Sequence, residues 1–239
     1  MTKILSRVLF ALSFSLALFA LQSLSAQDLG VGGPTKENLD LPFDAAGESE
    51  EEEDAPEIVT FYGQQLEGDG VFYVVDKSGS MRDQGELAIA QREVIRNVQE
   101  FSDRVQFGIV FFDSNVVKFP ASGMPAEANP GMKAAAVSFV LSVVGVPGSC
   151  CQKGLAEALR MANLATPKRK VIVYVGDGGG HCNMDQVQYH QQTLAAITGQ
   201  NYQRIPINCI AVLNPEPIQI EFLKKLSGNN GGTYTRIVR

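Results

Sequence analysis

Apolar residues beyond position 58 follow two patterns that alternate along the chain. Short continuous apolar runs, typical of strands covered on both faces, alternate with segments in which apolar residues return at helical spacing. The predicted strands are 71–75, 105–112, 116–119, 171–175, 205–213 and 233–238. The predicted helices are 86–101, 132–144, 155–164, 185–197 and 218–226, the last ended by Gly228. This alternation predicts an α/β fold: a doubly wound, mostly parallel sheet with helices on both faces.

The first 26 residues show a different pattern. Lys3 and Arg7 open an apolar run that ends at Leu21, and Ala26 offers a small residue for cleavage. This order predicts a secretory signal peptide over residues 1–26. An uncleaved anchor is the alternative, but the apolar run is shorter than the roughly 20 residues of a spanning helix. We therefore expect a secreted or periplasmic chain without membrane insertion after cleavage.

Residues 27–57 lack any apolar period. They hold several glycines and prolines and an acidic run made of Glu48, Glu50, Glu51, Glu52, Glu53 and Asp54. Such a segment cannot bury enough apolar surface to offset the entropy lost on ordering. We expect a disordered spacer over 27–57 and one domain over 58–239. The alternative role for the spacer is a loose tail that attracts calcium or basic groups.

The charge balance argues against nucleic acid as a partner. The chain carries 20 Lys and Arg residues against 26 Asp and Glu residues. Without residues 1–26 the balance is 18 against 26, a net charge of −8. An acidic protein repels a phosphate backbone unless its basic residues cluster. The short basic cluster at 168–170 opens a predicted strand, which favours a solvated strand end.

The most informative polar residues follow the strand 71–75. Asp76 ends the run, and Ser78 and Ser80 stand second and fourth after it. One carboxylate and two hydroxyls on a tight turn offer the oxygen ligands that Mg²⁺, Ca²⁺ and Mn²⁺ prefer. Gly79 allows the sharp bend that aims both hydroxyls at one point. A Ser-rich turn that caps the following helix is the alternative.

A second carboxylate is expected beside the first. Asp177 follows the strand 171–175 and precedes three glycines. In a doubly wound sheet, ligands bind at the carboxyl ends of the strands, so Asp76 and Asp177 should share one edge. Taken alone, Asp before Gly is a common turn pair. The expected position beside Asp76 favours a metal-binding role for Asp177.

These residues resemble the Asp-x-Ser-x-Ser motif of von Willebrand factor type A domains. The Asp177-Gly178 pair follows in the family order, and 231–234 resembles the Gly-Gly-x-Tyr start of the family's last strand. Before the helix at 155, the family usually has Gly-Thr, and Ser149 stands at the Thr position. A Ser hydroxyl offers the same oxygen with a looser rotamer, so we expect a retained site with weaker affinity.

The resemblance covers 71–238 and implies a metal ion-dependent adhesion site. It implies that Ser78 and Ser80 ligate the cation directly, and that Ser149, Asp76 and Asp177 do so directly or through water. The cation would be Mg²⁺ or Ca²⁺, with Mn²⁺ as a further candidate. One open position would take a carboxylate from an extracellular or envelope protein or peptide.

The resemblance therefore implies a binding module and not an enzyme. Two alternatives stay open: a structural or assembly subunit without functional metal, and a metal-dependent hydrolase with Asp76 or His181 as base. The family usually ends with a helix after the last strand, whereas this chain ends at Arg239. We expect that C-terminal helix to be missing, and with it any affinity switch by helix displacement. One sheet face would then need cover from residues 58–69 or from a partner.

Four cysteines remain after the leader, and export permits disulfides. We expect Cys182 to pair with Cys150 or Cys151, because their loops should meet near the metal. Cys209 lies in a predicted strand and should be a buried thiol. A zinc site of three cysteines and His181 is the alternative.

Several other polar residues are expected to lie outside the site. His181 is expected as an exposed loop residue, and His190, in the middle of a helix, at the surface. Asp113 is followed by Ser and Asn and is read as part of a turn, not as a ligand. Successive side chains of an extended segment point to opposite sides, so Lys77 should point away from the metal.

Overall fold

The computed structural model describes residues 55–238, so the predicted leader and most of the predicted spacer lie outside the described residues. A seven-stranded sheet forms the centre of the domain. Its strands are β3 (Gly70–Asp76), β4 (Gln106–Phe112), β5 (Val116–Phe119), β6 (Ala126–Glu127), β7 (Lys170–Gly176), β8 (Ile207–Ala211) and β9 (Tyr234–Arg236). The order is β5-β4-β3-β7-β8-β9, with β6 beside β4. Only β5 and β6 are antiparallel to their neighbour, which confirms the predicted, mostly parallel sheet.

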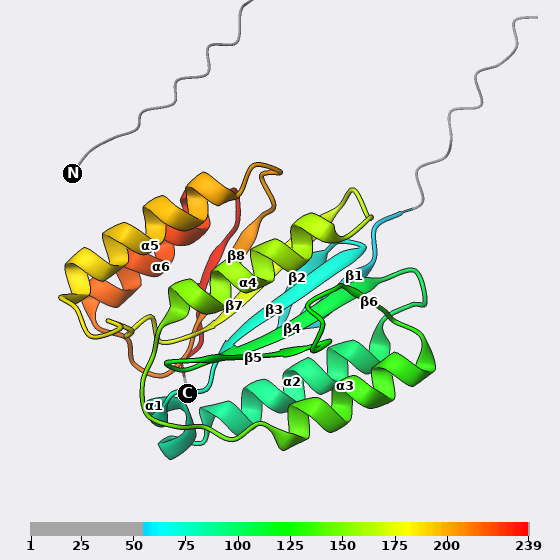
Figure 1. Ribbon diagram of the computed structural model, residues 1–239, viewed down its shortest axis with the longest axis horizontal. Coiled ribbons are helices and arrows are strands. Elements are labelled where there is room, and N and C mark those ends of the chain that lie inside the picture. The colour runs from blue at the N-terminus through cyan, green and yellow to red at the C-terminus, as the bar shows by residue number, and fades with distance from the viewer. Residues whose placement is uncertain (1–54, 239) are drawn as a thin grey trace, which may run out of the picture. The chain divides into compact units, whose positions relative to one another are not determined.

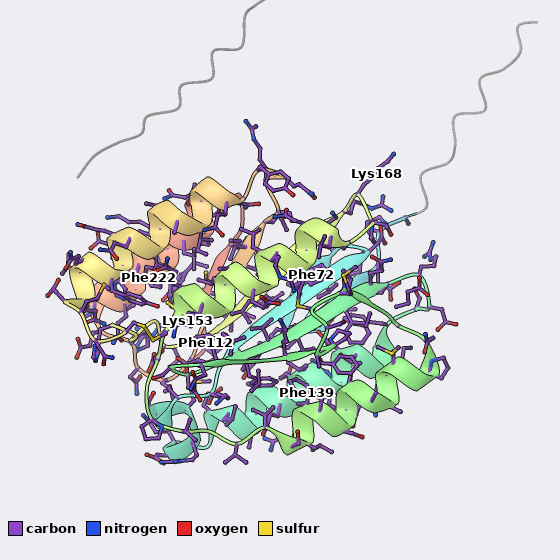
Figure 2. All side chains as sticks on the ribbon, viewed as in Figure 1. Phe72, Phe112, Phe139, Lys153, Lys168 and Phe222 are labelled. Atoms are coloured by element: carbon purple, nitrogen blue, oxygen red, sulfur yellow. A yellow bond between two sulfur atoms is a disulfide. The ribbon has the colours of Figure 1, made fainter. Side chains whose placement is uncertain are left out.

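Helices cover both faces of this sheet (Figure 1). They are α1 (Gly79–Asp83), α2 (Glu86–Glu100), α3 (Pro130–Ser142), α4 (Cys151–Leu164), α5 (Gln186–Gln200) and α6 (Pro217–Asn229). The α2–α3 pair shares one apolar core with the sheet, and α4, α5 and α6 share the other. Phe139 of α3 and Phe222 of α6 point into these two cores (Figure 2). None of the helices between residues 55 and 238 combines the length and apolar content that a bilayer crossing requires.

The continuous apolar run of β3 reflects its central position. All seven of its residues are buried. Val71, Tyr73 and Val75 face the core of α2 and α3, whereas Phe72 and Val74 face the core of α4. Successive side chains of a strand point to opposite faces, so a strand covered on both sides must be apolar throughout.

Two predicted helix boundaries are wrong. The helix predicted from 155 begins at Cys151, and Gly154 lies inside it. A Cβ on Gly154 would lie 2.8 Å from the Phe112 ring, so this glycine permits the close approach of α4 to β4. The last helix extends through Gly228 to Asn229. The Asn230 side chain closes its end by donating to the Leu226 carbonyl at 2.8 Å.

A β-hairpin completes the cover of one face. It pairs β1 (Ile58–Phe61) with β2 (Gln64–Glu67). Val59, Phe61 and Leu66 are buried in the same core as α2, and Thr235 of β9 donates to Gln64 at 3.3 Å. The hairpin therefore provides the cover that the sequence led us to expect from residues 58–69.

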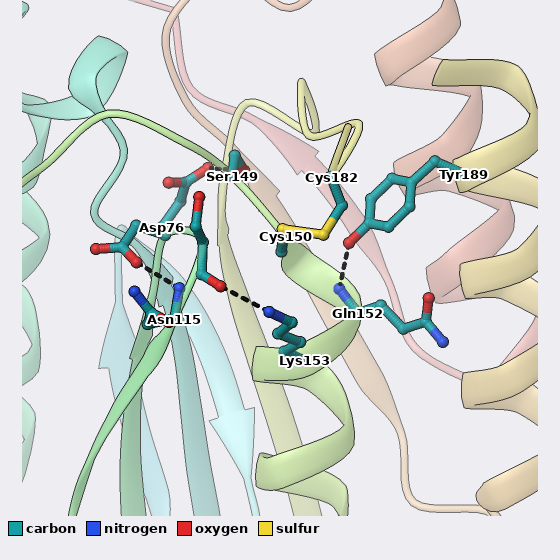
Figure 3. The surroundings of a disulfide bond; sticks show 10 residues. Asp76, Asn115, Ser149, Cys150, Gln152, Lys153, Cys182 and Tyr189 are labelled. Atoms are coloured by element: carbon teal, nitrogen blue, oxygen red, sulfur yellow. Dashed lines mark hydrogen bonds between the residues drawn. A yellow bond between two sulfur atoms is a disulfide. The ribbon is translucent and has the colours of Figure 1, made fainter. Parts of the chain in front are cut away.

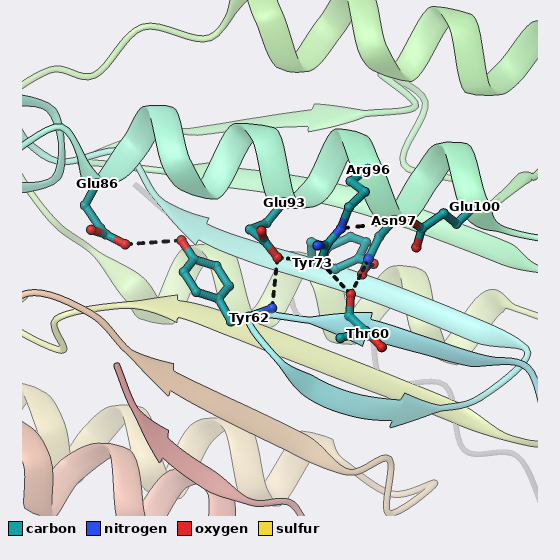
Figure 4. Close-up of polar contacts among 8 residues, drawn as sticks. All are labelled: Thr60, Tyr62, Tyr73, Glu86, Glu93, Arg96, Asn97 and Glu100. Atoms are coloured by element: carbon teal, nitrogen blue, oxygen red, sulfur yellow. Dashed lines mark hydrogen bonds and ion pairs between the residues drawn. The ribbon is translucent and has the colours of Figure 1, made fainter. Parts of the chain in front are cut away.

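Polar contacts fasten this hairpin to α2 (Figure 4). The Asn97 side-chain nitrogen donates to the Thr60 carbonyl at 2.7 Å, and its oxygen accepts from the Tyr73 hydroxyl at 2.9 Å. The backbone nitrogen of Tyr62 donates to Glu93 at 2.9 Å. These contacts satisfy polar groups at the buried edge of the hairpin, which would otherwise destabilise the fold.

Candidate metal centre

The structure gathers all five residues predicted as metal ligands at the carboxyl edge of the central sheet. The Ser149 hydroxyl donates to Asp76 Oδ2 at 3.2 Å, and the Ser80 hydroxyl donates to Asp177 Oδ2 at 3.1 Å. The hydroxyl oxygens of Ser78 and Ser80 are 3.1 Å apart. Three loops far apart in sequence thus bring hydroxyl and carboxylate oxygens to one place. Their role as metal ligands stays a prediction.

Each carboxylate is held by its own loop. Asp76 Oδ1 accepts from the backbone nitrogen of Ser78 at 2.7 Å, and Asp177 Oδ1 accepts from that of Gly179 at 2.8 Å. In both residues the second oxygen therefore points to a serine hydroxyl. Gly180 allows the third loop to approach, because a Cβ there would lie 2.7 Å from the Ser149 carbonyl oxygen.

The electrostatics of the metal-free site are unfavourable for a carboxylate. Burial, followed by repulsion from Asp177, raises the pKa of Asp76 to about 7, although hydrogen bonds from Ser78 and Ser149 oppose the shift. A divalent cation among these oxygens would offset both negative charges. The donor set of two carboxylates and three hydroxyls is the hard oxygen set that Mg²⁺ and Ca²⁺ accept. The residues present therefore fit such a cation.

Metal binding is expected to strengthen as the pH rises through about 7, the raised pKa of Asp76. The cation must displace the proton, so affinity should fall by up to about tenfold for each pH unit below that value. The pKa is higher in the folded than in the unfolded chain, so the metal-free fold should gain stability as the pH falls from about 7 to about 4. Calorimetric titration of Mg²⁺ at about pH 6 and about pH 8 checks the first trend. An affinity that stays constant with pH would contradict it.

A disulfide joins two of the three loops (Figure 3). Cys150 pairs with Cys182, and their Cα atoms are 4.9 Å apart. This confirms that Cys182 pairs with one member of the adjacent cysteine pair. The structure selects Cys150, because Cys151 opens α4 and is fully buried as a free thiol. The bond uses two of the thiols that the alternative zinc site would need, so that alternative is wrong.

The disulfide fastens Ser149 to the loop that follows Asp177. The bond closes a loop with a sequence separation of 32. Its removal in the double variant Cys150→Ser/Cys182→Ser should therefore lower the free energy of unfolding by about 3–4 kcal/mol. Metal affinity should also fall several-fold, because Ser149 loses its covalent anchor. Thermal unfolding and calorimetric titration measure the two effects. Cys209→Ala, which removes a thiol from the core, should leave metal affinity unchanged.

A buried ion pair supports the site, and sequence reasoning did not find it. Lys77 lies between two predicted ligands, yet it is buried and forms an ion pair with Asp113. The Lys77 carbonyl accepts from Val146 at 3.1 Å, and the Asp113 carbonyl accepts from Cys150 at 2.8 Å. These backbone hydrogen bonds hold the loop of Ser149 against the ends of β3 and β4, and the ion pair joins the two residues that accept them. The sequence carried no local signal for this pair, because it depends on the register of the two strands, in which Asp76 lies opposite Phe112.

The prediction that His190 lies at the surface is wrong. Its ring is 5% exposed and stacks on Phe222 with 4.2 Å between centroids. The Nε2 atom lies 3.0 Å from the Gly178 carbonyl oxygen, so the ring supports the loop that follows Asp177. Burial lowers the pKa of His190, which favours the neutral ring. His181 is exposed, as expected.

An open hollow of about 490 Å³ is lined by four of the five residues, whereas Asp76 is fully buried. Ser78, Ser80, Ser149 and Asp177 line its floor. Arg82 and Lys153 are exposed side chains among its lining residues, together with Asp83, which pairs with Arg82 at 2.7 Å. The mouth of the site thus combines open space for a ligand with two positively charged side chains and one carboxylate.

Comparison with known proteins agrees with this architecture. No family model matches the chain. It is 24% identical over 177 residues to inter-alpha-trypsin inhibitor heavy chain H4 from Homo sapiens, a match that covers 70% of this chain and 18% of that protein. A von Willebrand factor type A structure from Catenulispora acidiphila matches with a TM-score of 0.61 and 17% identity, over 77% of this chain and 46% of the other.

The pilus adhesin SpaC from Lactobacillus rhamnosus GG, in its open conformation, matches with a TM-score of 0.53 and 12% identity. The match covers 76% of this chain and 28% of the adhesin. The described chain therefore has the von Willebrand factor type A fold, as the resemblance of its motifs predicted. It spans less than half the length of each of these three proteins.

Proposed function

We propose that this chain is an exported binding module that holds a divalent cation and contacts a carboxylate of a protein partner through it. The ligands are Asp76, Ser78, Ser80, Ser149 and Asp177. The observation that supports this function is the convergence of their oxygens, through the hydrogen bonds Ser149–Asp76 and Ser80–Asp177, at the edge of the sheet. The cation is Mg²⁺ or Ca²⁺, and Mn²⁺ can replace it.

The serine hydroxyls and the two carboxylates of the site have different roles. The hydroxyls of Ser78 and Ser80, which carry no charge, would hold the cation through their oxygens. The two carboxylates offset the charge of the cation, and each is oriented by a backbone nitrogen of its own loop. Protein oxygens need not fill every position around a hard cation, so an outside carboxylate can complete the coordination.

The surroundings of the hollow favour an acidic partner. Arg82 and Lys153 add positive charge beside the cation, which Asp83 offsets in part, although the chain without its leader is acidic overall. Complementary charges at the rim speed the encounter of partners and suppress wrong ones. The likeness to a pilus adhesin agrees with binding outside the cytoplasm, and the chemistry of the site favours a partner that presents a carboxylate.

An immobilised acidic peptide provides the test of this function. The wild-type chain should be retained in Mg²⁺ and released by a chelator, and Ser80→Ala should lose retention. Ser114→Ala is the matched control, because Ser114 lines the same hollow without joining the cluster of five residues. Retention that persists in chelator would assign binding to Arg82 and Lys153 alone. A site that takes up no metal would favour the alternative of a structural subunit.

A further inference from the structure

We propose that the acidic run at residues 48–54 of one copy binds the metal centre of a second copy, so that the protein associates head to tail. The inference rests on the proposed function, because the metal centre must hold its cation. It names the partner of that site as another molecule of this chain.

The chemistry of the run matches the mouth of the site. Six of its seven residues are acidic: Glu48, Glu50, Glu51, Glu52, Glu53 and Asp54. One carboxylate can ligate the cation while its neighbours face Arg82 and Lys153, which are both exposed on the hollow. A run of carboxylates thus suits this mouth better than an isolated acidic side chain.

The described part of the chain begins at the opposite edge of the sheet from the site (Figure 1). Glu57 is fixed there: its carbonyl accepts from Gly68 at 2.9 Å, and its carboxylate accepts from the backbone of Ser102 at 3.1 Å. Gly68 precedes β3 and Ser102 precedes β4, so Glu57 lies at the amino edge of the sheet. Asp76 ends β3 at the carboxyl edge.

Chain length disfavours a contact between the run and the site of its own copy. The seven residues of β3 span about 23 Å, and a path around the flanking helices adds roughly 10 Å. From Glu57, which is fixed, to Glu48, the most distant acidic residue of the run, nine residues cover at most about 32 Å when fully extended. The whole segment would have to be stretched to bring even one carboxylate to the site of its own copy. The site of a second copy has no such restriction.

The described chain begins at the amino edge of the sheet and the site lies at the carboxyl edge, so the proposed contact joins two different surfaces. Such a heterologous contact can repeat from copy to copy and produces chains or closed rings. We therefore expect the protein to associate in Mg²⁺ in a concentration-dependent way and to return to monomers in chelator.

A mixing experiment with two variants tests this inference. The first variant, Asp177→Ala, loses the site and keeps the run. The second replaces the six acidic residues of the run by their amides and keeps the site. Analytical ultracentrifugation in Mg²⁺ should show monomers for each variant alone and, for the mixture, a complex that holds one copy of each. A control with Asp28, Glu37, Asp40 and Asp44 changed to amides should associate like the wild type.

The outcomes separate this inference from the proposed function. Mg²⁺ binding by the run variant, without any complex in the mixture, would overturn the inference and leave the metal centre standing. Lack of Mg²⁺ binding by the wild type would overturn both. Association that resists chelator would also overturn the inference. Thermal unfolding of each metal-free variant establishes that it is folded before mixing.

Discussion

Asp76→Ala is expected to reduce the affinity for Mg²⁺ at least about 100-fold while leaving the metal-free fold as stable as the wild type or more so. The variant loses a proposed ligand that contacts both Ser78 and Ser149. It also removes a buried carboxylate that Asp177 repels, which is why metal-free stability should not fall. Calorimetric titration measures the first effect and urea unfolding without metal measures the second.

The matched control for this variant is Asp83→Ala. Asp83 lines the same hollow, but it is exposed and pairs with Arg82. Its removal should leave the heat of Mg²⁺ binding nearly unchanged. Added Mg²⁺ at about 100 times its dissociation constant should stabilise the wild type and Asp83→Ala by about 2.7 kcal/mol. Stabilisation of Asp76→Ala by the same amount would contradict the assignment of this ligand.

Lys77→Met should lower the free energy of unfolding by about 3–5 kcal/mol, because it leaves the carboxylate of Asp113 buried without its counter-ion. Both side chains are almost completely buried. The double variant Lys77→Met/Asp113→Leu removes both charges and should recover most of the loss. Urea unfolding of the two single variants and the double variant gives the coupling between the residues.

Two further measurements test the role of this ion pair. Lys225→Met breaks the exposed pair with Glu221 and should change stability little. The loss of the Lys77 side chain should also weaken Mg²⁺ binding, since it leaves Asp113, whose carbonyl holds the segment that carries Ser149, without its counter-ion. Unchanged Mg²⁺ affinity in Lys77→Met would limit the pair to a role in stability.

The arrangement of the sheet and the meeting of the five predicted ligands were predictable from the sequence. Continuous apolar runs mark strands buried on both faces, so the residues that follow Val75 and Val175 are readable as strand ends. Parallel strands place those ends at one edge, which brings Asp76 and Asp177 together. Ser149 required the resemblance to a known family, because a lone loop serine carries no local signal.

Features that depend on distant partners were not predictable. The burial of Lys77 depends on Asp113, and that of His190 on Phe222 of another helix. Gly154 looked like a loop residue, although it lies in a helix that approaches Phe112 closely. The choice between Cys150 and Cys151 depended on where α4 begins, and helix boundaries are poorly marked in a sequence.

Diffraction from crystals grown with Mn²⁺, recorded for its anomalous signal, tests the metal centre most directly. We expect one strong peak within roughly 2.0–2.6 Å of the hydroxyl oxygens of Ser78 and Ser80. Asp76, Ser149 and Asp177 should surround the same peak, either directly or through water. A well-ordered site without a peak, or a peak bound by other residues, would contradict the proposed metal centre.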